Sequence, residues 1–345
     1  MSESRKGGFG AKESDAWAEA IRKGSRRDLA RAITLVESNR IEDVEPAQEL
    51  LERLIPFSGG ADRIGISGMP GAGKSTFIET LGHILADKGH KLAVLAVDPS
   101  SPVSGGSILG DKTRMAELSR MESVFIRPSP AGRTPGGVAR KTRETMLLCE
   151  AAGFDIVLIE TVGAGQSEWR VASMTDLFIV LLLPHAGDAL QGIKRGILEL
   201  SDIILVNKAD GPRMDAALQT VEQYRNAVQI LGDGSPETIV RPCSALERTS
   251  VGECWQAAGE MLSTRKEDTR FDQRRRTQIR QWIRSTAEDS LLQLLDEVQD
   301  ASGMLDELER DIREGKTTPL RAGLSVRDRI ISEAGRRKPD SGLPR

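Results

Sequence analysis

Between about residues 60 and 263, short segments made almost wholly of apolar residues alternate with longer segments in which apolar residues recur at helical spacing. The short segments are predicted to be strands at residues 64–67, 92–97, 156–160, 177–183, 203–206 and 238–241. They lack an apolar–polar alternation, which is typical of parallel strands covered on both faces. The pattern predicts an α/β fold with a doubly wound, mostly parallel sheet, whose ligand lies beyond the carboxyl ends of the strands.

A tail and a helical extension are predicted before this domain, in residues 1–59. Ser25, followed three residues later by Asp28, resembles the capping box that starts a helix. The apolar residues behind it recur on helical faces and are Leu29, Ala32, Ile33 and Val36, continued by Leu50, Leu51, Leu54 and Ile55. We therefore expect a helical layer that packs on the main domain.

The residues after the domain, 264–345, are predicted to form a charged helical arm and a disordered tail. Helices are expected at residues 273–298, 304–313 and 326–334. The apolar positions of the first helix are Trp282, Ile283, Leu291, Leu292, Leu294 and Leu295. Such an arm is too thin to bury them alone, so a partner subunit is the natural cover. Helices that fold back on their own domain are the alternative.

The composition, 39% hydrophobic and 29% charged, is globular, with no apolar stretch long enough to cross a bilayer and no secretory leader. We expect a cytoplasmic location without membrane contact. The net charge of −3 gives no general attraction for nucleic acid, and the arginine run at residues 274–276 is predicted to be a solvated helix face. Scattered cysteines and histidines without ligand spacing oppose a disulfide frame and a store of zinc or nickel.

A glycine-rich loop follows the strand at residues 64–67 and runs into a helix predicted to begin near Phe77. Glycines let successive backbone N–H groups point into one anion-sized hollow. We expect Lys74 to reach the β- and γ-phosphates and the Ser75 hydroxyl to coordinate Mg²⁺. The predicted phosphate-binding residues are Gly68, Pro70, Gly71, Ala72, Gly73, Lys74, Ser75 and Thr76. A purely structural turn is the alternative, which the strand, the helix and the GKST sequence together oppose.

Two acidic residues are predicted at the ends of later strands. Asp98 closes the strand after the loop's helix, and Glu160 is expected to close the next strand. Mg²⁺ prefers an octahedron of phosphate, water and one or two carboxylate oxygens, and these carboxylates are within reach. Gly163 lies three residues past Glu160, where a backbone N–H can meet the γ-phosphate. A ribose ligand of a dinucleotide fold is the alternative for Asp98, but the GKS loop lacks that spacing.

The residue after Gly163 bears on the rate of hydrolysis. In Ras-like enzymes a glutamine that orients the attacking water stands there, whereas this chain has Ala164. We therefore expect slow intrinsic hydrolysis, which a docking partner corrects by supplying an arginine or repositioning a loop. The arginines of this chain that are candidates for that role are Arg114, Arg133, Arg140 and Arg143.

A second motif predicts which base is bound. The strand at residues 203–206 ends in Asn207, Lys208, Ala209 and Asp210. An aspartate accepts both N1–H and N2–H₂ of guanine, a pattern that adenine does not offer, while the lysine stem lies over the ring and the asparagine ties this loop to the phosphate loop. After the next strand, a backbone N–H of the segment Ser244, Ala245 and Leu246 is expected to contact guanine O6.

These motifs and the sequence between them resemble the MeaB/ArgK family of P-loop GTPases. The matching segments are LARAITLVES at residues 29–38, GMPGAGKST at 68–76, VDPSS at 97–101, GSILGDKTRM at 106–115, ETVGAGQSE at 160–168 and DALQGIKRGI at 188–197. The resemblance extends from about residue 25 to residue 262. It implies a G domain of the SIMIBI type and a homodimeric GTPase that chaperones an adenosylcobalamin-dependent acyl-CoA mutase, usually methylmalonyl-CoA mutase, by gating cofactor loading and guarding against inactivation.

The resemblance also implies roles for residues outside the nucleotide motifs. Asp98 and Asp111 would belong to a first switch and to the Mg²⁺ site, and residues 160–166 to a second switch. The segment 187–194 would be a third switch that signals to the mutase, with Gln191 and Lys194 three residues apart; an ordinary helix surface is the alternative for this pair. The departures from the family pattern are Ala164, Trp169, Arg170, His185 and Ala189, and they leave the choice of mutase open.

Two other function classes compete with a mutase chaperone. A metallochaperone GTPase that inserts nickel into a metalloenzyme would need histidine and cysteine clusters, which the chain lacks. A kinase tied to the transport of arginine and ornithine, after an older label of the group, would need a groove for a phosphate acceptor, and no sequence feature predicts one.

Overall fold

The computed structural model describes residues 11–97, 115–128, 135–161, 168–184, 195–231 and 238–336. The tails predicted at the two ends lie largely outside these ranges. The chain separates into two compact units, Met1–Arg280 and Gln281–Arg345, and each is described by itself. Within the described residues, no helix is both long enough and apolar enough to pass through a membrane.

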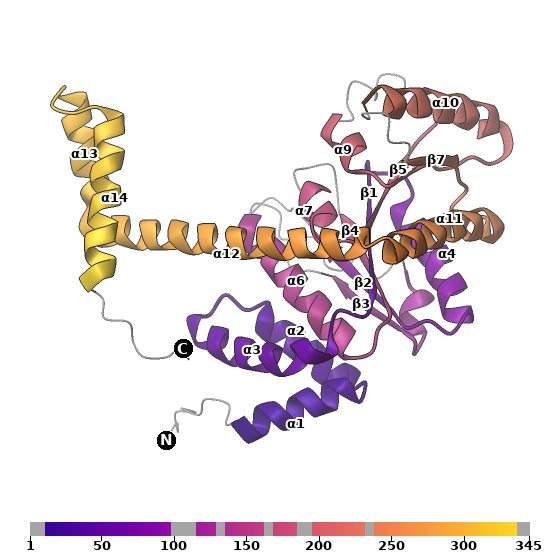
Figure 1. The fold of residues 1–345 in the computed structure, drawn as a ribbon, viewed down its shortest axis with the longest axis horizontal. Coiled ribbons are helices and arrows are strands. Elements are labelled where there is room, and N and C mark those ends of the chain that lie inside the picture. Colours follow the sequence, from indigo (N-terminus) through magenta and orange to yellow (C-terminus); the bar gives the residue numbers. More distant parts are fainter. Residues whose placement is uncertain are drawn as a thin grey trace. The chain divides into compact units, whose positions relative to one another are not determined.

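A seven-stranded parallel sheet forms the centre of the first unit (Figure 1). Its strands are β1 (Asp62–Gly68), β2 (Leu92–Val97), β3 (Val124–Pro128), β4 (Ile156–Thr161), β5 (Leu177–Leu182), β6 (Ile203–Val206) and β7 (Ile239–Pro242). Their order across the sheet is β3-β2-β4-β1-β5-β6-β7, and every neighbouring pair is parallel. The doubly wound parallel sheet predicted from the apolar segments is therefore confirmed.

The strand β3 is absent from the sequence prediction, and its presence corrects the place given to Glu160. β3 lies between β2 and β4 along the chain, so the strand that carries Glu160 is not the next strand after β2. Glu160 is also followed by Thr161 within β4 rather than closing it. In the sheet, however, β2 and β4 are neighbours, with Ala96 paired with Glu160, so the two strand ends still meet.

Helices cover both faces of the sheet (Figure 1). The helices of the first unit are α1 (Ala11–Arg22), α2 (Arg26–Val36), α3 (Ile41–Leu54), α4 (Lys74–Asp87), α6 (Pro135–Ala151), α7 (Glu168–Ala172), α9 (Arg195–Leu200), α10 (Met214–Leu231), α11 (Arg248–Glu267) and the start of α12 (Arg270–Ser302), with short 3₁₀ turns η1 (Ile55–Phe57), η2 (Leu118–Arg120) and η3 (Gly211–Arg213). α4 and α11 share one apolar core with the sheet, and the extension, α6, α7, α9 and α10 share the other. Successive strand residues alternate between these cores, as Val157 and Leu158 do.

The predicted helical layer before the domain is formed by α1, α2 and α3. Ser25 caps α2 by accepting a hydrogen bond from the Asp28 N–H, and the predicted apolar face of α2 is buried in the core shared with α6. Ile55 departs from the prediction, because it lies in η1 and is 51% exposed. α2 also contacts the missed strand, since Arg26 donates to the Val124 carbonyl over 2.6 Å.

The arginine run at the start of α12 does not form the solvated face that was predicted. Arg275 donates to both oxygens of the buried Asp176, over 2.8 and 2.7 Å, and to the Ala61 carbonyl over 2.6 Å. Arg274 donates to the Thr175 carbonyl over 2.9 Å. Only Arg276 of the three is exposed. Thr175 and Asp176 lie before β5, 99 residues earlier in the chain, and Ala61 lies 214 residues earlier, so no local pattern reveals these acceptors.

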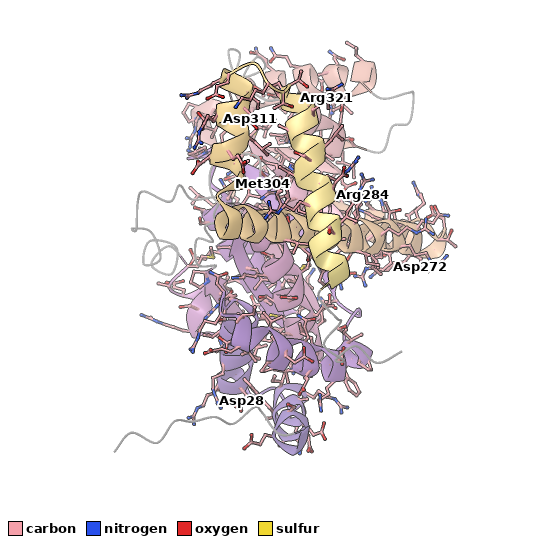
Figure 2. All side chains as sticks on the ribbon, turned by 90° about the vertical axis from the view of Figure 1, so that its left-hand side faces the viewer. Asp28, Asp272, Arg284, Met304, Asp311 and Arg321 are labelled. Atoms are coloured by element: carbon pink, nitrogen blue, oxygen red, sulfur yellow. The ribbon has the colours of Figure 1, made fainter. Side chains whose placement is uncertain are left out.

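The second unit contains the rest of α12, α13 (Met304–Arg313) and α14 (Pro319–Arg336). Figure 2 shows α13, with Met304 and Asp311 labelled, beside α14, with Arg321 labelled. Gly315, with φ of 73°, and a bond of 2.8 Å from the Lys316 N–H to the Asp311 carbonyl close the turn between them. α14 is twice the length predicted, because the helix begins at Pro319, seven residues before the predicted start.

Candidate nucleotide-binding site

The glycine loop connects β1 to α4 at the carboxyl edge of the sheet. Gly68, Gly71 and Gly73 have φ values of 147°, 79° and 91°. A Cβ on Gly68 would lie 2.3 Å from the Leu181 carbonyl oxygen, and one on Gly73 would lie 2.5 Å from Asn207 Nδ2. Only glycine therefore fits these two positions, and the backbone between them forms the hollow that an anion requires.

Lys74 is the first residue of α4, so the helix begins three residues earlier than the sequence suggested. Its side chain is buried inside the loop, where Nζ donates to the carbonyls of Gly68, over 2.7 Å, and Met69, over 3.3 Å. An ammonium group held over the hollow at a helix N-terminus favours an anion there. The two carbonyls thus hold the ammonium group at the place where phosphate oxygens would accept its hydrogen bonds.

Ser75 and Glu160 bring two oxygen ligands together beside this hollow. Ser75 Oγ lies 3.3 Å from Glu160 Oε1, and Glu160 is buried at 3% exposure on β4, paired with Ile66 of β1. The neighbouring Thr161 hydroxyl donates to Ser67 Oγ over 2.9 Å, which fixes the two strand ends to each other. A hydroxyl and a carboxylate next to an anion site fit the oxygen preference of Mg²⁺.

Asn207 joins three loops. Its Nδ2 donates to the Ala72 carbonyl in the glycine loop over 2.6 Å, and its Oδ1 accepts the Ala245 N–H over 2.9 Å. Thr80 of α4 holds the same segment by donating to the Ala245 carbonyl over 2.7 Å. Asn207 is 1% exposed, so these bonds form without competition from water. The structure thus brings the glycine loop and the loop after β6 together, as the sequence predicted.

Asp210 lies at the rim of this network. Ser244 donates to its Oδ2 over 2.9 Å, and Arg213 donates to its Oδ1. The hydrogen bonds from Arg213 and then Ser244 lower the pKa of Asp210 below the ordinary value. Lys208 adopts a left-handed conformation, with φ of 60°, which turns the chain between Asn207 and Asp210.

Two of the three amides expected at guanine O6 are already engaged. The Ser244 N–H donates to Ser250 Oγ over 2.9 Å, and the Ala245 N–H donates to Asn207. Leu246 follows them and is 75% exposed. Arg213, Ser250 and Thr80 did not emerge from the sequence, because each acts on a motif residue from outside the motif. Of these three residues, only Arg213 had a signal in the local sequence, because it lies three residues after Asp210 and can pair with it.

Several predicted site residues lie outside the described residues. They are Asp98, Asp111, Gly163, Ala164, His185, Ala189, Gln191 and Lys194. Trp169 and Arg170 are described: Trp169 is 54% exposed on α7, and the Arg170 guanidinium lies 5.6 Å from its ring centre. Of the candidate catalytic arginines, Arg143 is buried and donates to Ser173 Oγ over 3.1 Å. Burial, and then the charge of Arg63, lowers its pKa to about 10.

The glycine loop, the buried lysine at the start of α4 and the Asn207 loop at one edge of a parallel sheet define a P-loop GTPase. The sequence matches the family described as "Methylmalonyl Co-A mutase-associated GTPase MeaB" over residues 29–300, and the chain belongs to this family. Guanine-nucleotide binding follows from that membership. Among the described residues, no cluster of histidine, cysteine, aspartate or glutamate side chains is arranged to hold a metal ion by itself.

The chain is similar over most of its length to several named proteins. The chain is 48% identical over 316 residues to a probable GTPase of Mycobacterium tuberculosis, covering 90% of this chain and 94% of the relative. It is 43% identical over 314 residues to the mitochondrial methylmalonic aciduria type A homolog of Mus musculus, covering 87% and 75%. The crystal structure of LAO/AO transport system kinase superposes with a TM-score of 0.75 at 34% identity, covering 94% of this chain and 99% of that one.

Proposed function

We propose that this GTPase is a chaperone of an adenosylcobalamin-dependent acyl-CoA mutase, with methylmalonyl-CoA mutase as the partner. In this role it gates cofactor loading and protects the mutase from inactivation. The family description and the name of the mouse relative support the choice of partner. The single observation that carries the GTP-dependent part of the proposal is the Asn207 bridge between the glycine loop and the loop of Asp210, because it couples recognition of the base to the hollow for the phosphates.

In the proposed site, the residues from Gly68 to Thr76 enclose the phosphates. Lys74 Nζ exchanges the Gly68 and Met69 carbonyls for oxygens of the β- and γ-phosphates. Asp210 accepts guanine N1–H and N2–H₂, and the Lys208 stem lies over the base. The segment 244–246 faces guanine O6, and because the amides of Ser244 and Ala245 are engaged, the Leu246 N–H is the donor that we favour.

Mg²⁺ is proposed beside Ser75 and Glu160, whose oxygens lie 3.3 Å apart. Asp98 and Asp111 complete its protein neighbours. A bound Mg²⁺ would neutralise charge on the β- and γ-phosphate oxygens. Gly163 would offer a backbone N–H to the γ-phosphate, so that the segment after β4 responds to cleavage.

The three parts of the chain are proposed to divide the work. Residues 60–263 bind and hydrolyse GTP, residues 1–59 brace α6, and residues 264–345 form the arm through which two copies assemble. Gln191 and Lys194 pass the state of the nucleotide to the mutase. Exposed apolar side chains on the arm support the homodimer, since Ile283, Leu291 and Leu292 are 66%, 64% and 59% exposed in the single chain.

The decisive experiment measures GTP turnover with and without purified methylmalonyl-CoA mutase. Because Ala164 replaces the water-orienting glutamine of Ras-like enzymes, turnover by the chain alone is expected to be slow, and the mutase is expected to raise it by about two orders of magnitude or more. Lys74→Ala is the control that removes the phosphate contact. A flat rate with every acyl-CoA mutase of the source organism rejects the proposal. Phosphate transfer to a periplasmic binding protein would instead favour the activity named for the similar kinase structure.

A further inference from the structure

Asp210 holds an ion pair that the nucleotide motif does not explain. Arg213 donates to Asp210 Oδ1, while Ser244 donates to Oδ2, so both carboxylate oxygens are engaged. If Asp210 reads guanine, as proposed above, it must present an oxygen to each of two donors, N1–H and N2–H₂. Ser244 brings one hydroxyl and no charge, whereas Arg213 brings a planar cation to Oδ1.

The backbone places Arg213 for this contact. Asp210 precedes η3, and the Arg213 N–H donates to the Asp210 carbonyl over 3.1 Å, so main chain and side chain close the same four-residue turn. Pro212 inside the turn fixes φ and keeps Arg213 at that spacing. The contact is therefore held by local geometry and does not require the rest of the domain to move when it opens.

The exposure of the pair shows that it can open at little cost. The Arg213 side chain is 48% exposed and that of Asp210 is 22% exposed. Exposed pairs of this kind contribute little to stability, because water solvates both ions when they separate. An arginine that is half in solvent is able to rotate away, whereas Asp210 stays where the loop holds it.

We propose that Arg213 is a positioning residue that sets guanine affinity by competing with the base for Asp210 Oδ1. In the absence of nucleotide, its guanidinium keeps the carboxylate ionised and oriented. When guanine enters, Arg213 withdraws into solvent and Oδ1 accepts from the base. This inference rests on the proposed role of Asp210 as the guanine reader, and it adds that Arg213 competes with guanine for the carboxylate.

The test compares GDP affinity of wild type and Arg213→Ala by titration calorimetry. Removal of the competitor is expected to tighten GDP binding by about 1.5- to 5-fold, the range that corresponds to an exposed ion pair. The gain should shrink at high ionic strength, where the pair in wild type is already screened. Arg225→Ala is the matched control, because Arg225 pairs with Glu222 at the same three-residue spacing, and the two side chains are 47% and 64% exposed. This variant should not change GDP affinity.

Inosine diphosphate separates competition from a general loosening of the loop. It lacks the N2 amino group and needs only one carboxylate oxygen, so Arg213→Ala should tighten its binding less than that of GDP. Equal gains for both nucleotides, no gain, or weaker GDP binding would each overturn the competition. Asp210→Ala separates a failure of the proposed base reader from a failure of the competition. If Asp210→Ala leaves GDP affinity unchanged, the base-reading role of Asp210 is rejected. If Asp210→Ala weakens GDP binding but Arg213→Ala does not tighten it, only the competition by Arg213 is rejected.

Discussion

At the scale of single residues, two constraints meet at Gly73 of the glycine loop. It combines a left-handed φ of 91° with a contact distance of 2.5 Å from a Cβ to Asn207 Nδ2. Gly71 has a similar φ of 79°, but a Cβ there meets nothing within 4 Å. The two positions therefore share backbone strain and differ in the clash, which makes them a matched pair.

Gly71→Ala is expected to lower the free energy of unfolding by about 1–2 kcal/mol through the left-handed conformation alone. Gly73→Ala is expected to lower it by about 2–5 kcal/mol, because the methyl group also displaces Asn207 from the Ala72 carbonyl and leaves buried polar groups unsatisfied. Urea unfolding without nucleotide measures both. Equal losses would show that Asn207 yields without cost.

The pH dependence of guanine binding also belongs to this scale. Hydrogen bonds from Arg213 and Ser244 lower the pKa of Asp210, so in wild type the carboxylate stays ionised at pH values below the ordinary aspartate range. The part of the affinity that depends on this ionised form is present above that pKa and is lost as pH falls through it.

In Arg213→Ala the pKa of Asp210 is expected to rise toward the ordinary value, so GDP affinity should begin to fall at a higher pH than in wild type. Affinity measured along an acid titration, with unfolding followed in parallel, tests this. Arg213→Lys keeps the charge and should retain most of the acid tolerance. Coincident profiles for wild type and Arg213→Ala would contradict the role of the pair.

At the scale of elements, charged side chains fix the start of α12 to the amino-terminal edge of the sheet. Arg275 binds Asp176, whose side chain is fully buried, and Asp176 also accepts the Arg63 N–H over 2.9 Å. Arg265 of α11 donates to Asp202 over 2.6 Å, with both side chains buried. Such buried ion pairs add little net stability compared with apolar side chains of similar size, but removal of one partner leaves the other charge buried and unpaired.

Arg275→Ala is therefore expected to lower the free energy of unfolding by about 3–5 kcal/mol. Arg276→Ala, one residue along the same helix and exposed, should change it by less than about 0.5 kcal/mol. Urea unfolding of the full chain compares the two. A small loss in Arg275→Ala would mean that water replaces the guanidinium beside Asp176.

The same elements show what sequence could and could not provide. Buried parallel strands produce apolar runs, so β1, β2, β4, β5 and β6 were predicted, and the edge strand β7 was predicted as well. β3, the other edge strand, was missed; only Val124 and Phe125 of it are buried. The arginine run was misread since its acceptors, Thr175 and Asp176, are distant in sequence.

Sequence singles out candidate site residues wherever chemistry fixes residue type and spacing within one loop, as for Lys74, Ser75 and Asn207, and the structure brings these residues to one end of the sheet. The resting bonds of Lys74 to the Gly68 and Met69 carbonyls were not predicted, because they depend on the fold of the loop itself. Arg213 and Thr80 were not predicted either. They bind Asp210 and the Ala245 carbonyl from neighbouring turns, where the residue type is less restricted.

At the scale of the whole molecule, the arm carries exposed apolar side chains that a partner would be expected to cover. In the second unit, Met304, Ala322 and Val326 are buried, whereas Leu291 and Leu292 of α12 are 64% and 59% exposed in the single chain. Two adjacent exposed leucines on a long helix favour a partner surface, and burial of each contributes about 1.5–3 kcal/mol. The proposed homodimer supplies that surface.

Replacement of both leucines, Leu291→Glu with Leu292→Glu, is expected to convert the dimer to a monomer, because two carboxylates would have to be desolvated in the interface. Ser290→Glu is the control: at 100° per residue it faces about 150° away from the middle of the leucine pair, so the dimer should persist. Light scattering after size exclusion reads the mass. GDP affinity should be equal in all three proteins, since the arm lies outside the nucleotide motifs. A double variant that remains dimeric would place the dimer interface elsewhere. A monomeric wild type would mean that a different protein covers the exposed leucines, and the mutase would be the first candidate to test.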